Sequence, residues 1–259
     1  MIIAATLAGA GCGGSDPVAS TSTSAAEGNL AGFMRDIGAE LNDFWAAEWG
    51  EGWSPARVKV PQQSADTDCG VIDANNTGPA YCGADSTMVL PVDFFRAEII
   101  DADDSGRNDA AVAAVLGHEF GHHLQNIAGL GEAVTEAQAA IPDAANLLSV
   151  ANELHADCMM GIWMSSVDDE KRLEPGDLDE VLVALEKIGD DRLSADAGVV
   201  AEASEFDHGT SEQRQVWFGV GFETQDADKC AIVFDDLEDG TLEEELKAGA
   251  DAANASSGE

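Results

Sequence analysis

Three histidines and one glutamate lie within nine residues, in the stretch GHEFGHHLQ at positions 117–125. On a helix each residue turns by about 100°, so His118 and His122 share a face and Glu119 lies beside them. Two imidazoles with this spacing can hold one zinc ion, and the glutamate then lies next to a bound water. His123 points toward an apolar stripe instead, so we expect it to be packed or hydrogen-bonded. The run therefore supplies two metal ligands, and a third must come from elsewhere.

The best candidate for the third ligand lies in NELHADC, at positions 152–158. Glu153 and Asp157 are four residues apart and share a helix face. Glu153 can give a carboxylate oxygen to the metal, and Asp157 can accept the N–H of a ligand histidine, which fixes its tautomer. The alternative is a solvated acidic face, but the flanking LLSVAN and CMMGIW are apolar, and buried carboxylates need a partner or a metal. His155 points away from this face, and we expect it to be structural.

Four blocks then carry a family resemblance: HEFGHHLQ, ELHADC followed by GIW, IGDDRL (188–193) and HGTSEQRQVWFGVGF (208–222). With YCGADSTMVLPVDFF they resemble the neutral zinc metallopeptidases of bacteria, in that family's order and over roughly residues 28–230. The resemblance implies that His118, His122 and Glu153 bind Zn²⁺ and that Glu119 is the catalytic base. We expect an exported domain of zincin-like α+β fold, mostly helical with a small β-sheet.

These residues predict a peptidase in which zinc has three protein ligands and a water in the fourth position. Glu119 takes a proton from that water and passes it to the leaving nitrogen of a peptide or protein substrate. The alternative is a non-catalytic, zinc-stabilised cell-surface protein that binds a partner without turnover. A structural zinc site is usually closed by four protein ligands, and Glu119 is not needed as a ligand, so catalysis is favoured.

The block HGTSEQR opens another helix. Thr210, three residues before Gln213, predicts a capping box, and His208 lies just outside the helix start. His208 could stabilise the oxyanion of a tetrahedral intermediate, as donors beside zinc do in related peptidases, or it could only brace the turn. Arg214 could donate to the substrate, but a salt bridge is the favoured interpretation.

Composition narrows the class of protein further. The 259 residues are 45% hydrophobic, as in a globular domain. Lys and Arg number 12 against 50 Asp and Glu, a net charge of −38 that would repel nucleic acid. This charge indicates a heavily solvated surface and says little about the fold. No segment approaches the roughly 18 apolar residues of a membrane-spanning helix.

The N-terminal segment 1–12 has the layout of an export signal, and a flexible Gly/Ser/Thr/Pro-rich tether follows over 13–27. It resembles a lipoprotein signal in which Cys12 is lipidated. It departs from that pattern because no Lys or Arg precedes the apolar run and Gly9 stands where Leu is usual. We therefore expect an exported protein, either lipid-anchored at the membrane through Cys12 or secreted.

The other four cysteines form an even set, as expected for disulfides in an oxidising compartment. Cys69 and Cys82 flank a turn-rich stretch and are predicted to pair, which leaves Cys158 to pair with Cys230. The alternative is four ordinary buried thiols.

The stretch DADDSGRND (101–109) copies the start of a calcium loop. Its twelfth position is Val112, where the loop needs a bidentate glutamate. An acidic loop before the zinc-motif helix is therefore favoured over a calcium site.

The spacing of apolar residues predicts the helices and strands that hold these residues in place. Phe33, Ile37, Leu41 and Phe44, spaced by four or three, predict a helix over 28–49. Short strands are predicted at 56–61 and 87–92. Further helices are predicted at 109–127, 132–140, 144–165, 177–188 and 211–222. These elements form one domain, 28–234, and the acidic tail 235–259 is predicted to be a loose helix that frays.

Overall fold

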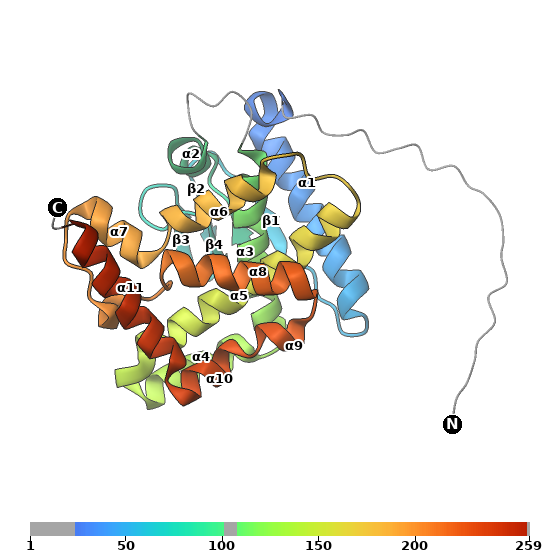
Figure 1. Ribbon diagram of the computed structural model, residues 1–259. Coiled ribbons are helices and arrows are strands. Elements are labelled where there is room, and N and C mark those ends of the chain that lie inside the picture. Colours follow the sequence, from blue (N-terminus) through green and yellow to red (C-terminus); the bar gives the residue numbers. More distant parts are fainter. Residues whose placement is uncertain (1–23, 101–107, 258–259) are drawn as a thin grey trace, which may run out of the picture.

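The computed structural model describes residues 24–100 and 108–257, and most of them are helical (Figure 1). The strands are β1 (Arg57–Lys59), β2 (Ser64–Thr67), β3 (Gly70–Asp73), β4 (Ala80–Cys82) and β5 (Thr87–Val89). The helices are α1 (Ser24–Trp49), α2 (Val92–Phe94), α3 (Asp109–Ile127), α4 (Leu130–Ala140), α5 (Ala145–Asp169), α6 (Asp177–Lys187), α7 (Asp190–Ala197), α8 (Ser211–Thr224), α9 (Ala227–Cys230), α10 (Val233–Asp239) and α11 (Thr241–Ser257). Short helical turns occur at Phe95–Ile99, Pro142–Ala144 and Ala203–Glu205. This content is consistent with the expected α+β class.

Two small sheets precede the zinc-motif helix. In the first, β5 lies between β1, which is parallel to it, and β4, which is antiparallel. The second is the antiparallel hairpin of β2 and β3. The strands predicted at 56–61 and 87–92 are β1 and β5, each shorter than predicted. The hairpin was not predicted, because its strands are largely exposed and lack an apolar alternation.

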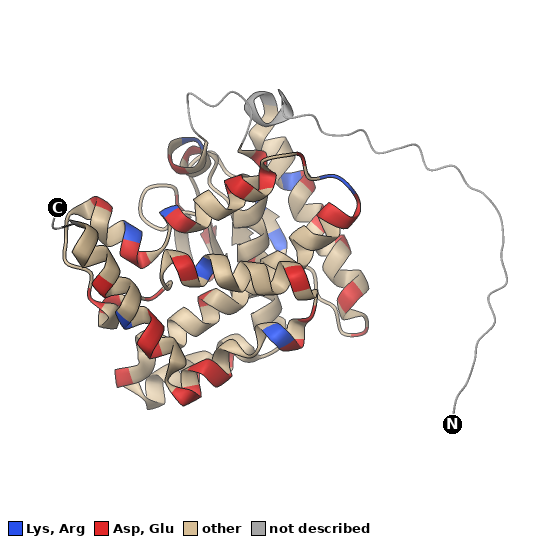
Figure 2. Ribbon diagram, viewed as in Figure 1, with Lys and Arg blue, Asp and Glu red and all other residues tan. Residues whose placement is uncertain are grey.

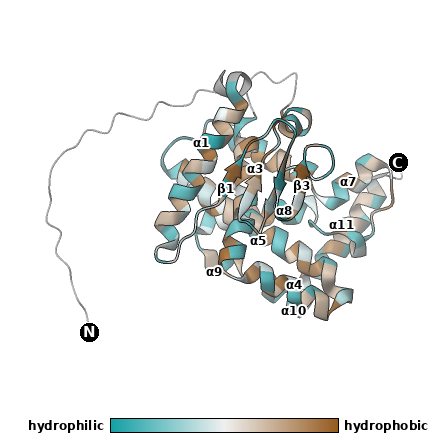
Figure 3. Ribbon diagram, turned by 180° about the vertical axis from the view of Figure 1, so that it is seen from behind, coloured by the Kyte–Doolittle hydropathy of each residue, from teal (hydrophilic) through white to brown (hydrophobic). Residues whose placement is uncertain are grey.

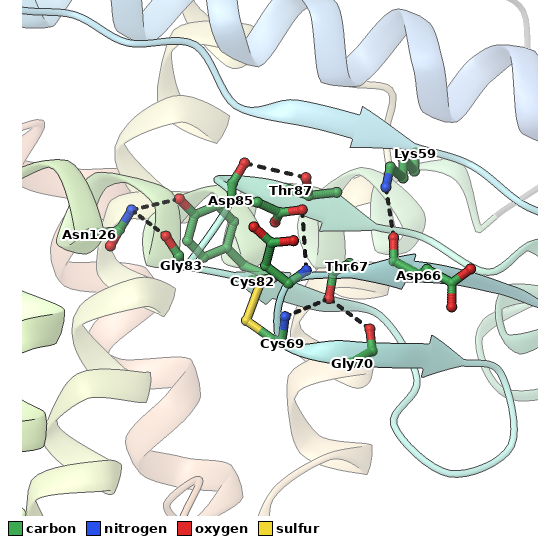
Figure 4. Close-up of a disulfide and its surroundings, with 12 residues drawn as sticks. Lys59, Asp66, Thr67, Cys69, Gly70, Cys82, Gly83, Asp85, Thr87 and Asn126 are labelled. Atoms are coloured by element: carbon green, nitrogen blue, oxygen red, sulfur yellow. Dashed lines mark hydrogen bonds between the residues drawn. A yellow bond between two sulfur atoms is a disulfide. The ribbon is translucent and has the colours of Figure 1, made fainter.

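A disulfide between Cys69 and Cys82 joins the turn of this hairpin to β4, as predicted (Figure 4). The same end of β4 is attached to the zinc-motif helix. Asn126 of α3 donates to the Gly83 carbonyl at 3.3 Å and to the Tyr81 hydroxyl at 3.0 Å. The sheet is thereby held against α3, beside the predicted site.

The helices α3, α5 and α8 form the centre of the molecule, with α8 lying across α5 (Figure 1). Glycines allow these helices to approach closely. A Cβ atom on Gly121 of α3 would lie 2.7 Å from Cα of Ala156 on α5. One on Gly221 of α8 would lie 1.8 Å from the carbonyl oxygen of Cys158 on α5. Since real side chains do not tolerate such distances, the small residues set how near α5 lies to both partners.

The apolar stripe predicted on α3 forms part of the main core, with Leu116, Phe120 and Leu124 each at most 2% exposed. The helix begins at Asp109 and ends at Ile127, the bounds predicted from the sequence. Seen from behind, α1 lies at one side of the molecule and α7 and α11 lie at the other, with α3 between them (Figure 3). The zinc-motif helix therefore runs through the interior with one face toward the core.

The acidic tail differs from the prediction. Helix α11 packs on the main core through Leu242, Leu246 and Ala250, which are 1%, 1% and 4% exposed. Their spacing of four residues places them on one helix face, while Glu243, Glu244, Glu245 and Asp251 are exposed. The prediction of a fraying tail was wrong because it weighed the average composition and overlooked this period.

Acidic positions are spread over the helices and greatly outnumber the basic ones (Figure 2). Among the described helices, none is long and apolar enough to cross a membrane. Cys12, with the expected lipidation, lies outside the described residues. So do Asp101, Asp103, Ser105 and Gly106 of the loop that resembles a calcium site.

Candidate metal centre

Helices α3 and α5 bring His118, His122 and Glu153 together. The Nε2 atom of His118 lies 3.0 Å from one carboxylate oxygen of Glu153, and the Nε2 atom of His122 lies 3.3 Å from the other. One ligand atom from each residue falls within 4.8 Å of the other two. Helical periodicity places the two histidines on one face, and the packing of α5 against α3 adds the carboxylate.

The donor set fits zinc. Two imidazole nitrogens and a carboxylate oxygen are the ligands of many catalytic zinc sites, which bind them at about 2.0–2.2 Å. Two such ligands of a tetrahedral ion lie about 3.4 Å apart, close to the observed separations of 3.0 and 3.3 Å. Three protein ligands also leave a position for water or substrate.

Charge in the site favours a cation. Burial alone would lower the pKa of His118, but Asp157 and Glu153 outweigh that effect and raise it to about 10. Burial alone would raise the pKa of Glu153, but His122 and His118 hold it well below its usual range. The Glu153 carboxylate is therefore ionised, and it favours a positive charge at the point where the three ligand atoms converge.

Asp157 lies one turn beyond Glu153 and contacts His118 as predicted. Its Oδ1 atom is 2.7 Å from Nδ1 of His118, so the ring donates Nδ1–H and directs Nε2 toward Glu153. Arg214 of α8 donates to both Asp157 oxygens, through Nε at 2.8 Å and Nη2 at 3.0 Å. Both Asp157 and Arg214 are at most 2% exposed. Arg214 thus forms the buried salt bridge that the sequence favoured over a contact with substrate.

His122 has a different partner, which the sequence analysis missed. Its Nδ1 atom lies 2.9 Å from Oε1 of Gln125, three residues later on α3. The signal was present, because residues three apart on a helix are neighbours. The spacing did not single out Gln125, because the usual acceptors for a ligand histidine are carboxylates, backbone carbonyls and water.

Glu119 is 8% exposed and lines the same cleft as the three candidate ligands. Burial raises its pKa, and the charges of His122 and His118 partly offset that effect. A carboxyl group with a raised pKa can accept a proton and release it again nearer to neutral pH. Its position suits proton transfer beside the metal.

The cleft has a volume of about 1130 Å³ and runs along the candidate ligands. One wall is apolar and includes Val115, Ile188 and Leu193. Glu132 and Glu136 of α4 also line the cleft. A cleft of this volume can hold several residues of an extended peptide.

His208 also lines the cleft, and the segment that carries it is held by Asp190. One oxygen of Asp190 accepts the backbone N–H groups of Asp207, His208 and Gly209 at 2.8–2.9 Å. The other oxygen of Asp190 lies 3.2 Å from Nδ1 of the His208 ring. The same Nδ1 atom lies 2.7 Å from a carboxylate oxygen of Asp207. The Asp190 hydrogen bond raises the pKa of His208. With Nδ1 engaged, Nε2 is the ring nitrogen left for a ligand in the cleft.

The neighbouring Asp191 holds the start of α8. Its Oδ1 atom accepts from both the backbone N–H and the hydroxyl of Ser211, each at 2.8 Å. The capping box of Thr210 and Gln213 is present as predicted. The block IGDDRL therefore positions the segment that leads to His208 and Arg214, a duty that the sequence did not reveal.

His123 is fully buried and directed away from the candidate ligands. Its Nε2 atom donates to the Ser54 carbonyl at 2.7 Å, so Nδ1 accepts from the Tyr81 hydroxyl at 3.0 Å. The prediction that His123 is hydrogen-bonded is confirmed.

Cys158, next to Asp157, forms the predicted disulfide with Cys230. The bond ties α5 to α9, so the helix that carries Glu153 is anchored covalently as well as by packing.

Comparison with known proteins agrees with this geometry. A family described as "Putative neutral zinc metallopeptidase" matches residues 8–233. "Uncharacterized protein YpfJ" of Escherichia coli K12 is 35% identical over 210 residues, which cover 79% of this chain and 71% of that protein. "Uncharacterized protein Rv2575" of Mycobacterium tuberculosis H37Rv is 34% identical over 190 residues, 69% of this chain and 62% of that protein. No solved structure matches the chain significantly.

Proposed function

The chain belongs to the neutral zinc metallopeptidase family, and from this premise we propose that it hydrolyses peptide bonds with zinc as cofactor and Glu119 as general base. One observation carries the proposal. Three ligand atoms converge from α3 and α5 at an open cleft, with a buried glutamate beside them that is not needed as a ligand. A site built only to stabilise the fold would usually be closed by a fourth protein ligand. The proposal includes a zincin-like arrangement of the domain.

In this mechanism His118, His122 and Glu153 hold the metal. When bound, zinc would supply Lewis-acid chemistry and lower the pKa of a water molecule toward neutral pH. Glu119 takes the proton from the attacking water and later delivers it to the leaving nitrogen. Asp157 keeps the ring of His118 in the tautomer that directs Nε2 toward the ion.

His208 contributes as a hydrogen-bond donor. The Asp190 hydrogen bond raises the pKa of His208 and favours the protonated ring, in which both nitrogens carry a hydrogen. Its Nδ1–H faces Asp190 and Asp207, and its Nε2–H can then donate to the oxygen that gains negative charge during attack. Arg214 does not take this part, since both Asp157 oxygens engage it. It neutralises Asp157 and keeps that side chain in place.

The proposed substrate is a peptide or protein outside the cytoplasm. The disulfides Cys69–Cys82 and Cys158–Cys230 support export, because such bonds persist in oxidising compartments. Anchoring by a lipid on Cys12 remains part of the proposal. A net charge of −38 argues against nucleic acid as a partner.

The test compares wild type with Glu119→Gln on a diverse peptide library, with both proteins loaded with zinc. Gln keeps the shape of the side chain but cannot accept the water's proton. We expect zinc content and thermal stability to stay near wild type, while hydrolysis falls by about 10²–10⁴-fold or more.

The second arm tests the metal. Glu153→Ala should lose stoichiometric zinc, measured by elemental analysis, and chelation of wild type should abolish cleavage. Cleavage that survives in Glu119→Gln would remove that residue from its role. If wild type binds zinc but cleaves nothing across pH and salt, the zinc-stabilised binding protein becomes the better interpretation.

A further inference from the structure

A buried histidine that the mechanism does not use lies close behind the candidate ligands. His155 of α5 is 9% exposed, and its ring lies 5.8 Å from that of Phe234 on α10. Its Nδ1 atom faces Nε2 of Gln125 at 3.2 Å. Gln125 is the residue that contacts His122, so His155 is one hydrogen bond removed from a candidate ligand.

The orientation of the Gln125 amide follows from its neighbours. One end of the amide lies 2.6 Å from the carbonyl oxygen of Asn152. That oxygen can only accept, so this end must be the NH₂ group. The same NH₂ group has a second hydrogen, which is directed at Nδ1 of His155. Nδ1 of His155 must then be the acceptor, and its ring carries its proton on Nε2.

The tautomer of His122 follows in turn. With the NH₂ end engaged by Asn152 and His155, the oxygen of Gln125 faces Nδ1 of His122 at 2.9 Å. An amide oxygen cannot donate, so His122 carries a proton on Nδ1. Its Nε2, the atom that faces Glu153, is therefore the nitrogen that can offer a lone pair to a metal.

We propose that Gln125 sets the metal-binding tautomer of His122 and that His155 holds the Gln125 amide in the orientation this requires. Both are positioning residues, because neither reaches the metal or the substrate. The inference rests on the proposed zinc centre and goes beyond it. It makes the second ligand histidine dependent on a neutral chain of hydrogen bonds that crosses from α3 to α5.

The two ligand histidines thus donate to different kinds of acceptor, one charged and one neutral. His118 donates to an ionised carboxylate that is paired with Arg214. His122 donates to an amide, which cannot turn over without placing its oxygen against the Asn152 carbonyl and the accepting nitrogen of His155. A reversed amide would present NH₂ to Nδ1 of His122 and would favour the tautomer with its proton on Nε2, which cannot bind zinc through that nitrogen.

The experiment measures zinc affinity, by competition with a chromophoric chelator, in four single variants and one double variant. Gln125→Met has a similar shape and lacks the acceptor. His155→Phe keeps an aromatic ring against Phe234 but loses the accepting nitrogen. His155→Asn loses the ring but can place an oxygen near the former Nδ1. His123→Phe is the matched control, a buried histidine on α3 whose hydrogen bonds lead away from the site.

Gln125→Met should weaken zinc binding by about 10–100-fold, as losses of outer-shell partners do. We expect a smaller loss for His155→Phe, substantial recovery in His155→Asn, and affinity near wild type for His123→Phe. In the Gln125→Met background, His155→Phe should add no further loss, because the amide through which it acts is gone. In zinc-loaded wild type the Nδ1–H resonance of His122 should be protected from exchange, and Gln125→Met should remove that protection.

Several outcomes would overturn the inference. Gln125→Met with wild-type affinity would do so, as would equal losses in His155→Phe and His155→Asn, or additive losses in the double variant. If Gln125→Met fails to fold, the two His155 variants decide by themselves. None of these measurements uses peptide hydrolysis, so an inactive protein that binds zinc leaves the inference standing. A wild type that binds no zinc would overturn both the inference and the proposed function.

Discussion

At the level of single residues, the site depends on which ring nitrogen of each ligand histidine is available to a metal. His118 and His122 offer Nε2 toward Glu153 because each Nδ1 is engaged, by Asp157 and by Gln125 respectively. Asp157 in turn is ionised, because Arg214 and His118 lower its pKa against the effect of burial. The competence of the site therefore depends on hydrogen bonds one step behind the ligands.

Asp157→Asn tests this dependence at His118, whose hydrogen-bond acceptor is a charged carboxylate. The amide keeps the size of the carboxylate but removes its charge, so it supports His118 less well and leaves Arg214 buried without its anion. We expect zinc affinity to fall by about 10–100-fold, measured by chelator competition. Unchanged affinity would show that Asp157 serves the fold and not the metal.

At the scale of the element, the helices are positioned by contacts that sequence blocks alone do not reveal. The first turn of α7 holds the segment 207–211 through Asp190 and Asp191, and that segment leads into α8. Close approach of α8 to α5 then places Arg214 beside Asp157. Two connections thus position His208 and Arg214 at the cleft. The first joins Asp190 and Asp191 to the segment 207–211, and the second is the packing of α8 against α5.

Asp190 and Asp191 form a matched pair for testing the first connection. Both hold the same segment, but only Asp190 contacts the ring of His208. Asp190→Asn should lower kcat/KM toward the value of His208→Ala, a fall of up to about 10²–10³-fold for one lost oxyanion donor. Asp191→Asn should affect stability more than kcat/KM.

The double variant of Asp190→Asn with His208→Ala supplies the control. It should be no less active than His208→Ala alone, because Asp190 acts through His208. Additive losses would mean that Asp190 supports the fold and not that ring.

The second connection, the close approach of α8 to α5, can be tested at two glycines of α8. A Cβ on Gly221 would lie 1.8 Å from the Cys158 carbonyl oxygen, whereas one on Gly219 meets nothing within 4 Å. Gly221→Ala should lower the free energy of unfolding by about 1–3 kcal/mol or more, since backbone must shift. Gly219→Ala should raise it by up to about 1 kcal/mol through helix propensity. Urea unfolding of the pair measures both, and equal effects would contradict the close approach of α5 and α8.

At the scale of the whole molecule, one core joins the N-terminal helix to the C-terminal helix. Leu30 of α1 and Leu246 of α11 belong to the same buried cluster, although more than 200 residues separate them. The acidic C-terminal segment is therefore part of the folded domain, which has acidic positions on most of its helices (Figure 2). Among the described residues, the acidic side chains are exposed or half-buried except for Glu119, Asp157 and Asp177.

Leu246→Ala tests this role of the tail. Removing a side chain that is 1% exposed should lower the free energy of unfolding by about 2–5 kcal/mol. Val200→Ala, at a position 68% exposed, should change it by no more than about 0.5 kcal/mol. If both variants unfold at the wild-type urea midpoint, α11 is a loose appendage after all.

The features that could be predicted from the sequence are those that depend on local periodicity and on residue chemistry. His118, His122 and Glu119 are three or four positions apart or adjacent, so any helix over 109–127 brings them together, and the capping box at Thr210 is equally local. Tertiary structure decided the rest: Gln125 as the partner of His122, Arg214 as the partner of Asp157, the hold of Asp190 on the His208 segment, and the burial of α11. These contacts join elements far apart in the chain, or select one of several polar neighbours. They depend on how closely and at what angle helices pack, which no period within a single element specifies.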